Sequence, residues 1–197
     1  MAVDSPFRIP NVIFRTRVRD ALDKGYVWDD VTTQKLFAGK RCILFSLPGA
    51  FTPTCTERQV PDFEAMFPLF KQHGIDEIYC MSVNDTFVMN AWAKNLELKH
   101  VKVIPDGSAI FTTFMDMDVQ KDNLGFGIRS WRYALIVNDM RIEKSFIEQG
   151  KEDNADLDPY EATNPWAILD YLAIPAEGGR ALTLNLTDGV DSKAKMT

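Results

Sequence analysis

The stretch Pro48–Cys55, with the sequence PGAFTPTC, limits most strongly what this chain can fold into. It follows the apolar run Cys42–Leu47, which predicts a buried strand. Pro48 and Gly49 end that strand, and Pro53 suits a first helical turn, so Cys55 should lie about three residues into a helix. Free backbone N–H groups and the positive end of the helix dipole favour an anion there. The sequence thus predicts a cysteine held as a thiolate, the nucleophilic form.

Alternating strands and helices follow this stretch. The first expected elements are a helix to about Gly74, with Val60, Phe63, Met66, Phe67 and Phe70 on one face, and a strand Asp76–Val83. A helix capped at Asn84-Asp85 follows, with Phe87, Val88, Ala91, Trp92 and Leu96 on its inner face. The remaining elements are a strand Val101–Ile104, a short helix near Ile110, a strand Ser130–Val137, its hairpin partner Arg141–Glu148 and a closing helix to about Ala173. Short N-terminal strands or a hairpin precede them. We therefore expect an α/β thioredoxin fold, a central mixed sheet flanked by helices, with extra N-terminal strands.

Length and composition indicate a single domain. A chain of 197 residues that is 46% hydrophobic can bury one core, which we assign to residues 1–174. Residues 175–197 are polar and glycine-containing, and we expect a tail or linker with an edge strand at most over Leu182–Leu186. The net charge of -6 comes without a basic stripe, which argues against nucleic acid or a membrane surface as partner. No long apolar run or signal-peptide pattern occurs, so we expect a cytoplasmic protein.

Three cysteines and two histidines are too few for a disulfide framework or a convincing metal cluster. We therefore expect no metal and no cofactor. Cys42 lies inside the apolar strand and is best explained as a small buried hydrophobic residue.

Thr52 precedes Cys55 by three residues, where thioredoxin-like oxidoreductases carry a second cysteine. A vicinal disulfide is therefore impossible. The Thr52 hydroxyl could donate a hydrogen bond to a thiolate or orient an oxygen bound beside it. Alternatively, Thr52 only caps the helix, and Thr54 with Glu57 offers a competing capping box.

The motif Pro48-x-x-x-Thr52-x-x-Cys55 resembles the active-site signature of peroxiredoxins. Together with VPDF at 60–63, SVND at 82–85 and RSWRYALIVND at 129–139, the string PGAFTPTC resembles the peroxiredoxin 5 (plant type II) subfamily in particular. The similarity runs from about Phe7 to Ala173. It implies a thiol peroxidase that reduces hydrogen peroxide and organic hydroperoxides without metal or haem.

The resemblance implies a role for each motif residue. Cys55 would attack the peroxide and become a sulfenic acid. Thr52 would hydrogen-bond the thiolate and the peroxide, and Pro48 would shield the sulfur from water. Arg132 would stabilise the thiolate and polarise the peroxide oxygens, with Arg129 as the alternative.

The resemblance leaves the recycling step open. Cys80 lies where plant type II members carry a resolving cysteine, yet Tyr79-Cys80-Met81 has the pattern of a buried strand. Either Cys55 forms a disulfide with Cys80, or glutathione, glutaredoxin or thioredoxin reduces the sulfenic acid directly. No fused glutaredoxin motif occurs. Gln59 stands where the subfamily often has a histidine, which puts reductant docking in doubt.

Phe51, Leu124, Phe126 and Ile128 should lie in loops near Cys55. We expect Phe51 and Phe126 to line the substrate pocket and the four together to support a two-fold symmetric homodimer. The alternative is a monomer in which these side chains cover their own core.

Other functions remain to be weighed against the peroxidase. A cysteine hydrolase has little support, because neither His73 nor His100 has an evident orienting partner near Cys55. A peroxide sensor or chaperone-like scaffold would keep the same oxidisable thiol and is the alternative.

Overall fold

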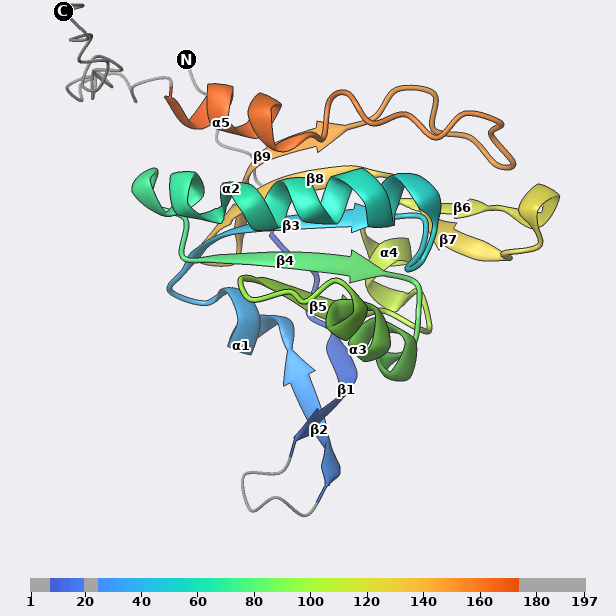
Figure 1. Cartoon of the computed structure of the whole chain (residues 1–197), viewed down its shortest axis with the longest axis horizontal. Coiled ribbons are helices and arrows are strands. Elements are labelled where there is room, and N and C mark those ends of the chain that lie inside the picture. Colours follow the sequence, from blue (N-terminus) through green and yellow to red (C-terminus); the bar gives the residue numbers. More distant parts are fainter. Residues whose placement is uncertain (1–7, 20–24, 174–197) are drawn as a thin grey trace, which may run out of the picture.

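The computed structural model describes residues 8–19 and 25–173, and a mixed five-stranded sheet forms its centre (Figure 1). The strand order is β5-β4-β3-β8-β9. The strands are β3 (Arg41–Leu47), β4 (Glu77–Ser82), β5 (Val101–Pro105), β8 (Tyr133–Asn138) and β9 (Arg141–Ile147). β3, β4 and β5 run parallel, whereas β8 and β9 are antiparallel to their neighbours. The predicted mixed sheet of a thioredoxin fold is confirmed.

Helices cover both faces of the sheet. The helices are α1 (Thr33–Phe37), α2 (Val60–Gln72), α3 (Thr86–Asn95), α4 (Ile110–Phe114) and α5 (Pro165–Ala173). Side chains of α2, α3 and α5 share one buried cluster with Phe45 of β3, and side chains of α1 and α4 share a second with Leu44. Neighbouring strand residues point to opposite faces, so β3 supplies both cores. The nearly continuous apolar pattern of this strand, interrupted only by Ser46 between Cys42 and Leu47, follows from that double burial.

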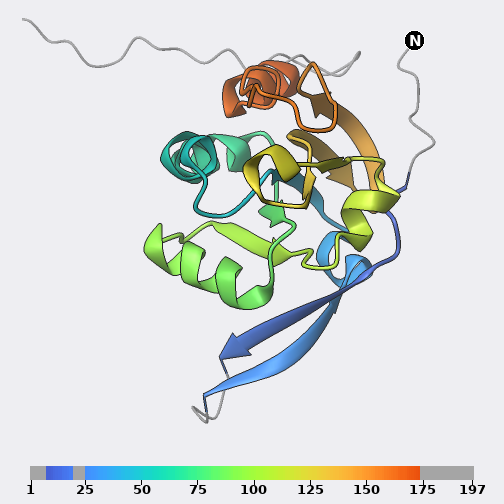
Figure 2. The same cartoon turned by 90° about the vertical axis from the view of Figure 1, so that its right-hand side faces the viewer.

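An N-terminal hairpin forms a separate two-stranded sheet. It consists of β1 (Ile13–Arg19) and β2 (Tyr26–Thr32), which pair antiparallel and project from the rest of the molecule (Figure 2). Trp28 of the hairpin meets Phe87 of α3 edge to face, with ring centroids 5.9 Å apart. Phe87 and Ala91 are exposed, so their predicted place on the inner face of α3 is wrong. Trp92 is buried there as predicted, together with Thr86 and Met89.

The predicted strand Ser130–Val137 is divided in two. β7 (Ile128–Ser130) pairs with β6 (Asp118–Gln120), and β8 begins only at Tyr133. Between them, the Trp131 backbone N–H donates to the Met117 carbonyl at 2.7 Å, and the Trp131 indole N–H donates to the Glu148 carbonyl at 2.8 Å. This interruption sets the direction of the next residue, Arg132. A 3-10 turn, Asp122–Leu124, lies in the loop between β6 and β7.

The predicted tail, residues 175–197, and its edge strand at Leu182–Leu186 lie outside the described residues. Their assignment as a separate segment stays a prediction.

Candidate active site

The helix after β3 carries Cys55 near its beginning, as predicted. Helical geometry begins at Pro53, and the residues Cys55–Gln59 form a π-helical turn that continues into α2. The Val60 backbone N–H donates to the Cys55 carbonyl, five residues back. Thr54 makes no capping hydrogen bond, so the alternative capping box with Glu57 does not form. The turn places the Cys55 side chain inside the protein, with none of its surface exposed.

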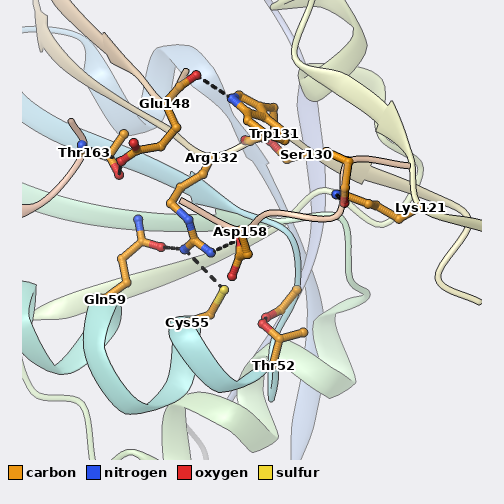
Figure 3. A network of polar contacts seen from close by, with 12 residues as sticks. Thr52, Cys55, Gln59, Lys121, Ser130, Trp131, Arg132, Glu148, Asp158 and Thr163 are labelled. Carbon is orange, nitrogen blue, oxygen red and sulfur yellow. Dashed lines mark hydrogen bonds and ion pairs between the residues drawn. The ribbon is translucent and has the colours of Figure 1, made fainter. Parts of the chain in front are cut away.

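Arg132 lies against the Cys55 sulfur (Figure 3). Its Nη1 donates to Cys55 Sγ at 3.5 Å, and only 1% of the residue is exposed. A guanidinium stays charged at any pH a protein meets, so it places a fixed positive charge beside the sulfur. The site can therefore stabilise a thiolate by hydrogen bonding and by charge in a buried position.

Two further side chains hold the Arg132 guanidinium. Nη1 also donates to Gln59 Oε1, and Nη2 donates to a carboxylate oxygen of Asp158. The ring of Tyr160 lies 5.8 Å from the guanidinium carbon. Burial works to lower the pKa of Arg132, but the negative charges of Cys55 and Asp158 outweigh it and raise that pKa above its ordinary value. The Arg132 guanidinium thus bonds the Cys55 sulfur and the Asp158 carboxylate at the same time.

Thr52 and Pro48 lie beside this centre. The Thr52 hydroxyl donates to the Gly49 carbonyl oxygen at 2.8 Å, not to Cys55, so the hydrogen bond predicted toward the sulfur is not the one observed. The Thr52 carbonyl accepts from the Thr56 N–H at 3.0 Å, in the first helical turn. Pro48 is buried at the end of β3.

A pocket of about 370 Å³ opens beside the site. Its wall contains Pro48, Thr52, Pro53, Thr54, Lys121, Leu124, Phe126, Ala155, Asp156, Leu157 and Asp158. Asp158 of this wall bonds Arg132, although neither Arg132 nor Cys55 lines the pocket itself. Phe126 lines this pocket, whereas Phe51 does not: the Phe51 backbone has a φ of 63°, and its ring centroid lies 6.4 Å from that of Trp92.

Arg129, the alternative to Arg132, lies close to Gly49 of the active-site loop and not against the Cys55 sulfur. Its Nη1 donates to the Val83 carbonyl and its Nε to the Phe126 carbonyl, both at 3.1 Å. Its guanidinium also lies 5.3 Å from the Phe126 ring centroid. These contacts hold the loop before β7 and do not include the Cys55 sulfur.

The other two cysteines are free thiols inside the two cores. Cys80 belongs to the same cluster as Cys55, on the α2 face of the sheet, whereas Cys42 belongs to the opposite cluster. Burial raises the pKa of the Cys42 thiol to about 12 and that of Cys80 well above its ordinary value. Both are therefore held as neutral thiols in the folded protein.

Sequence reasoning did not identify Asp158 or Tyr160. Both lie in the loop between β9 and α5, and neither belongs to one of the sequence motifs described above. Gln59, which stands where the subfamily often has a histidine, bonds Arg132, a contact that the sequence does not predict. Within residues 8–19 and 25–173, no group of three or more His, Cys, Asp or Glu side chains could hold a metal ion. No helix in that same part of the chain is long and apolar enough to cross a membrane.

Comparisons with known proteins agree with this geometry. A family model described as Redoxin matches residues 28–162. A peroxiredoxin of Rhizobium etli is 57% identical over 172 residues, covering 86% of this chain and 96% of the relative. Peroxiredoxin-2B of Arabidopsis thaliana is 44% identical over 122 residues, 61% of this chain and 75% of the relative. The solved structure of the Plasmodium falciparum antioxidant protein, a 1-Cys peroxiredoxin, aligns with a TM-score of 0.79 and 35% identity, over 84% of this chain and 97% of that one. This chain therefore belongs to the peroxiredoxin family of thiol-dependent peroxidases.

Proposed function

We propose that Cys55 is the residue that reacts with hydrogen peroxide and organic hydroperoxides. The thiolate attacks the terminal peroxide oxygen, a sulfur–oxygen bond forms, and the oxygen–oxygen bond breaks. Cys55 becomes a sulfenic acid, and the departing alkoxide or hydroxide takes up a proton to give an alcohol or water. The observation that carries this proposal is the 3.5 Å contact from Arg132 Nη1 to the buried Cys55 sulfur.

Arg132, Thr52 and Pro48 would each assist this step. The Arg132 guanidinium would hold the thiolate and stabilise the negative charge that develops on the leaving oxygen. The Thr52 hydroxyl now donates to the Gly49 carbonyl, yet its oxygen retains lone pairs that a peroxide O–H could use. Pro48, buried at the pocket wall, has no N–H to offer water and would keep the sulfur dry.

We further propose that an external thiol returns Cys55 to its reduced form. One thiol, of glutathione, glutaredoxin or thioredoxin, would condense with the sulfenic acid to give a mixed disulfide and water, and a second would release Cys55. Cys80 supports this choice because it is wholly buried and held as a neutral thiol, a poor nucleophile. The related Plasmodium falciparum protein is likewise a 1-Cys peroxiredoxin. A cytoplasmic location would supply these reductants in reduced form.

Turnover and intact mass together test the function. With peroxide and glutathione plus glutaredoxin supplied, the protein should consume many equivalents of peroxide per chain. With peroxide alone, its mass should rise by one oxygen, and Cys80→Ser should give the same increase. Consumption of only one equivalent of peroxide per chain, both with glutathione plus glutaredoxin and with thioredoxin as reductant, would favour a peroxide sensor. A loss of two hydrogens that disappears in Cys80→Ser would instead identify Cys80 as the resolving thiol.

We also propose a two-fold symmetric homodimer that uses the apolar surface near the active site. Phe51, Leu124, Phe126 and Ile128 are 52%, 57%, 37% and 45% exposed. Together they present more apolar area than a small peroxide needs, and an isologous contact would remove it from water.

Light scattering at micromolar concentration should report a dimer, and Phe126→Glu should shift the mass toward that of one chain. A charge placed in a closed apolar interface loses its hydration without gaining a partner. Leu69→Glu is the control, because Leu69 is a similarly exposed apolar side chain on α2. A wild-type monomer at high concentration would refute the dimer and leave the chemistry at Cys55 untouched.

A further inference from the structure

We propose that Asp158 is a positioning residue that orients the Arg132 guanidinium and limits the positive charge it presents to Cys55. This inference rests on the proposed roles of Cys55 and Arg132.

The two terminal nitrogens of the Arg132 guanidinium bond different partners. Nη1 faces the Cys55 sulfur and Gln59, and Nη2 faces Asp158 (Figure 3). The guanidinium is planar, so fixing Nη2 also fixes the direction of Nη1. The third nitrogen, Nε, is buried without a hydrogen-bond partner, so it adds no further restraint. Asp158 is therefore the carboxylate that sets how the Arg132 fork meets the sulfur.

The ion pair is unlike an ordinary surface pair. The Arg132 side chain is 1% exposed, whereas that of Asp158 is 44% exposed at the pocket wall. One partner is thus withdrawn from water while the other remains accessible to it, and a charge pair of this kind is screened less than one between two solvated side chains. Because the pair lies beside the Cys55 sulfur, the charge of each partner acts on that sulfur directly.

The loop that carries Asp158 is fixed on both sides of this residue. Before it, Lys121 Nζ donates to the Ala155 carbonyl at 2.7 Å. After it, the Tyr160 hydroxyl donates to an Asp62 carboxylate oxygen at 3.0 Å. Further along, the buried Glu148 carboxylate accepts from the backbone N–H groups of Glu161, Ala162 and Thr163 and from the Thr163 hydroxyl. Asp158 is held in place by this loop and does not reach Arg132 from a free segment.

The charged and titratable groups around the centre come from every element packed on it. They are Arg58 of the π-helical turn, Asp62 of α2, Cys80 of β4, Tyr160 of the loop, and Lys121 and Asp156 at the pocket wall. Burial raises the pKa of Tyr160 and of Cys80, so both stay neutral. Among the described residues, none of these groups forms a hydrogen bond to the guanidinium, whereas the Asp158 carboxylate bonds the same guanidinium as the Cys55 sulfur.

Removing the Asp158 charge should have two opposite effects. The whole charge of Arg132 would then act on the sulfur, so the thiolate would form at lower pH. The guanidinium would also lose the bond that orients it, so each thiolate would react more slowly with peroxide. A residue needed only for folding would not lower both the pH at which the Cys55 thiolate forms and the rate at which each thiolate reacts with peroxide.

Asp158→Asn separates these effects. Alkylation of Cys55 by iodoacetamide, followed by peptide mass spectrometry across pH, should show the midpoint falling by about one pH unit. The rate constant for hydrogen peroxide at a pH above both midpoints should fall about tenfold. Glu152→Gln is the matched control: it removes the same charge from an exposed position of the same loop, outside the pocket wall, and should leave both values at wild type. Asp158→Glu keeps the charge and should hold the midpoint near the wild-type value.

Three results would overturn the proposal: a midpoint unchanged in Asp158→Asn, an equal shift in Glu152→Gln, or a peroxide rate per thiolate that stays at the wild-type value. Alkylation measures the Cys55 thiolate without peroxide. A failure of the peroxidase assignment itself would instead appear as peroxide consumption that survives Cys55→Ser.

Discussion

Replacing Cys55 with serine is expected to abolish peroxide consumption and to leave the fold nearly unchanged. A serine hydroxyl is far less acidic than a thiol and supplies no nucleophilic anion near neutral pH. Serine is close to cysteine in size, and Arg132 Nη1 can donate to its oxygen in place of the sulfur. The cost in stability should therefore be small, about 1 kcal/mol or less. Loss of peroxide measured against time, with thermal unfolding of the same sample, checks both parts.

Cys42→Ser is the control for this substitution. Cys42 is equally buried but lies in the cluster on the opposite face of the sheet. The variant should keep the wild-type rate, although its buried hydroxyl costs some stability. Peroxide turnover that persists in Cys55→Ser would end the assignment of Cys55 as the reacting residue.

Substitutions at Arg132 should give the second-largest loss. Arg132→Lys keeps a positive charge but cannot bond Cys55, Gln59 and Asp158 from one planar group. The rate of peroxide reduction should therefore fall by about tenfold or more. Arg132→Ala also removes the charge, and its rate should fall by about 10²- to 10³-fold. Stopped-flow measurement of peroxide reduction at saturating reductant gives both values.

Arg129→Ala provides the comparison. Arg129 bonds the carbonyls of Val83 and Phe126, so its loss should loosen the loop before β7 and change the peroxide rate far less. If the pH profile of Cys55 reactivity were instead altered by Arg129→Ala and unaffected by both Arg132 variants, the roles of the two arginines would be reversed.

The position of Cys55 in the helix could be predicted from the sequence because the signals are local. Pro48 and Gly49 end a strand, Pro53 opens a helix, and the spacing of apolar residues after Val60 gives one buried face. The π-helical form of the turn could not be predicted, because Cys55–Gln59 precede the apolar positions that begin at Val60, so no periodic pattern runs across the turn.

The choice of Arg132 came from resemblance, because its surroundings depend on distant contacts. The pattern of Ser130–Val137 indicates one continuous strand, in which an arginine would normally face solvent. The strand is interrupted because the Trp131 backbone bonds Met117 and its indole bonds Glu148, and this turns Arg132 inward. Asp158 reaches Arg132 through a loop held by side-chain bonds to backbone groups, and such bonds have no periodic pattern in the sequence.

The pleat of the central sheet also decides which thiols can ever meet. Cys55 and Cys80 share the α2 side, while Cys42 points from β3 into the core on the other side. While the five strands stay paired, the sheet separates Cys55 from Cys42. An oxidised Cys55 cannot reach the Cys42 sulfur even if its helical turn opens. An internal disulfide of Cys55 in the folded chain therefore has one available partner, Cys80. A mass loss of two hydrogens that Cys80→Ser abolishes would identify that bond, because a sulfenamide formed with a backbone nitrogen would give the same loss without Cys80.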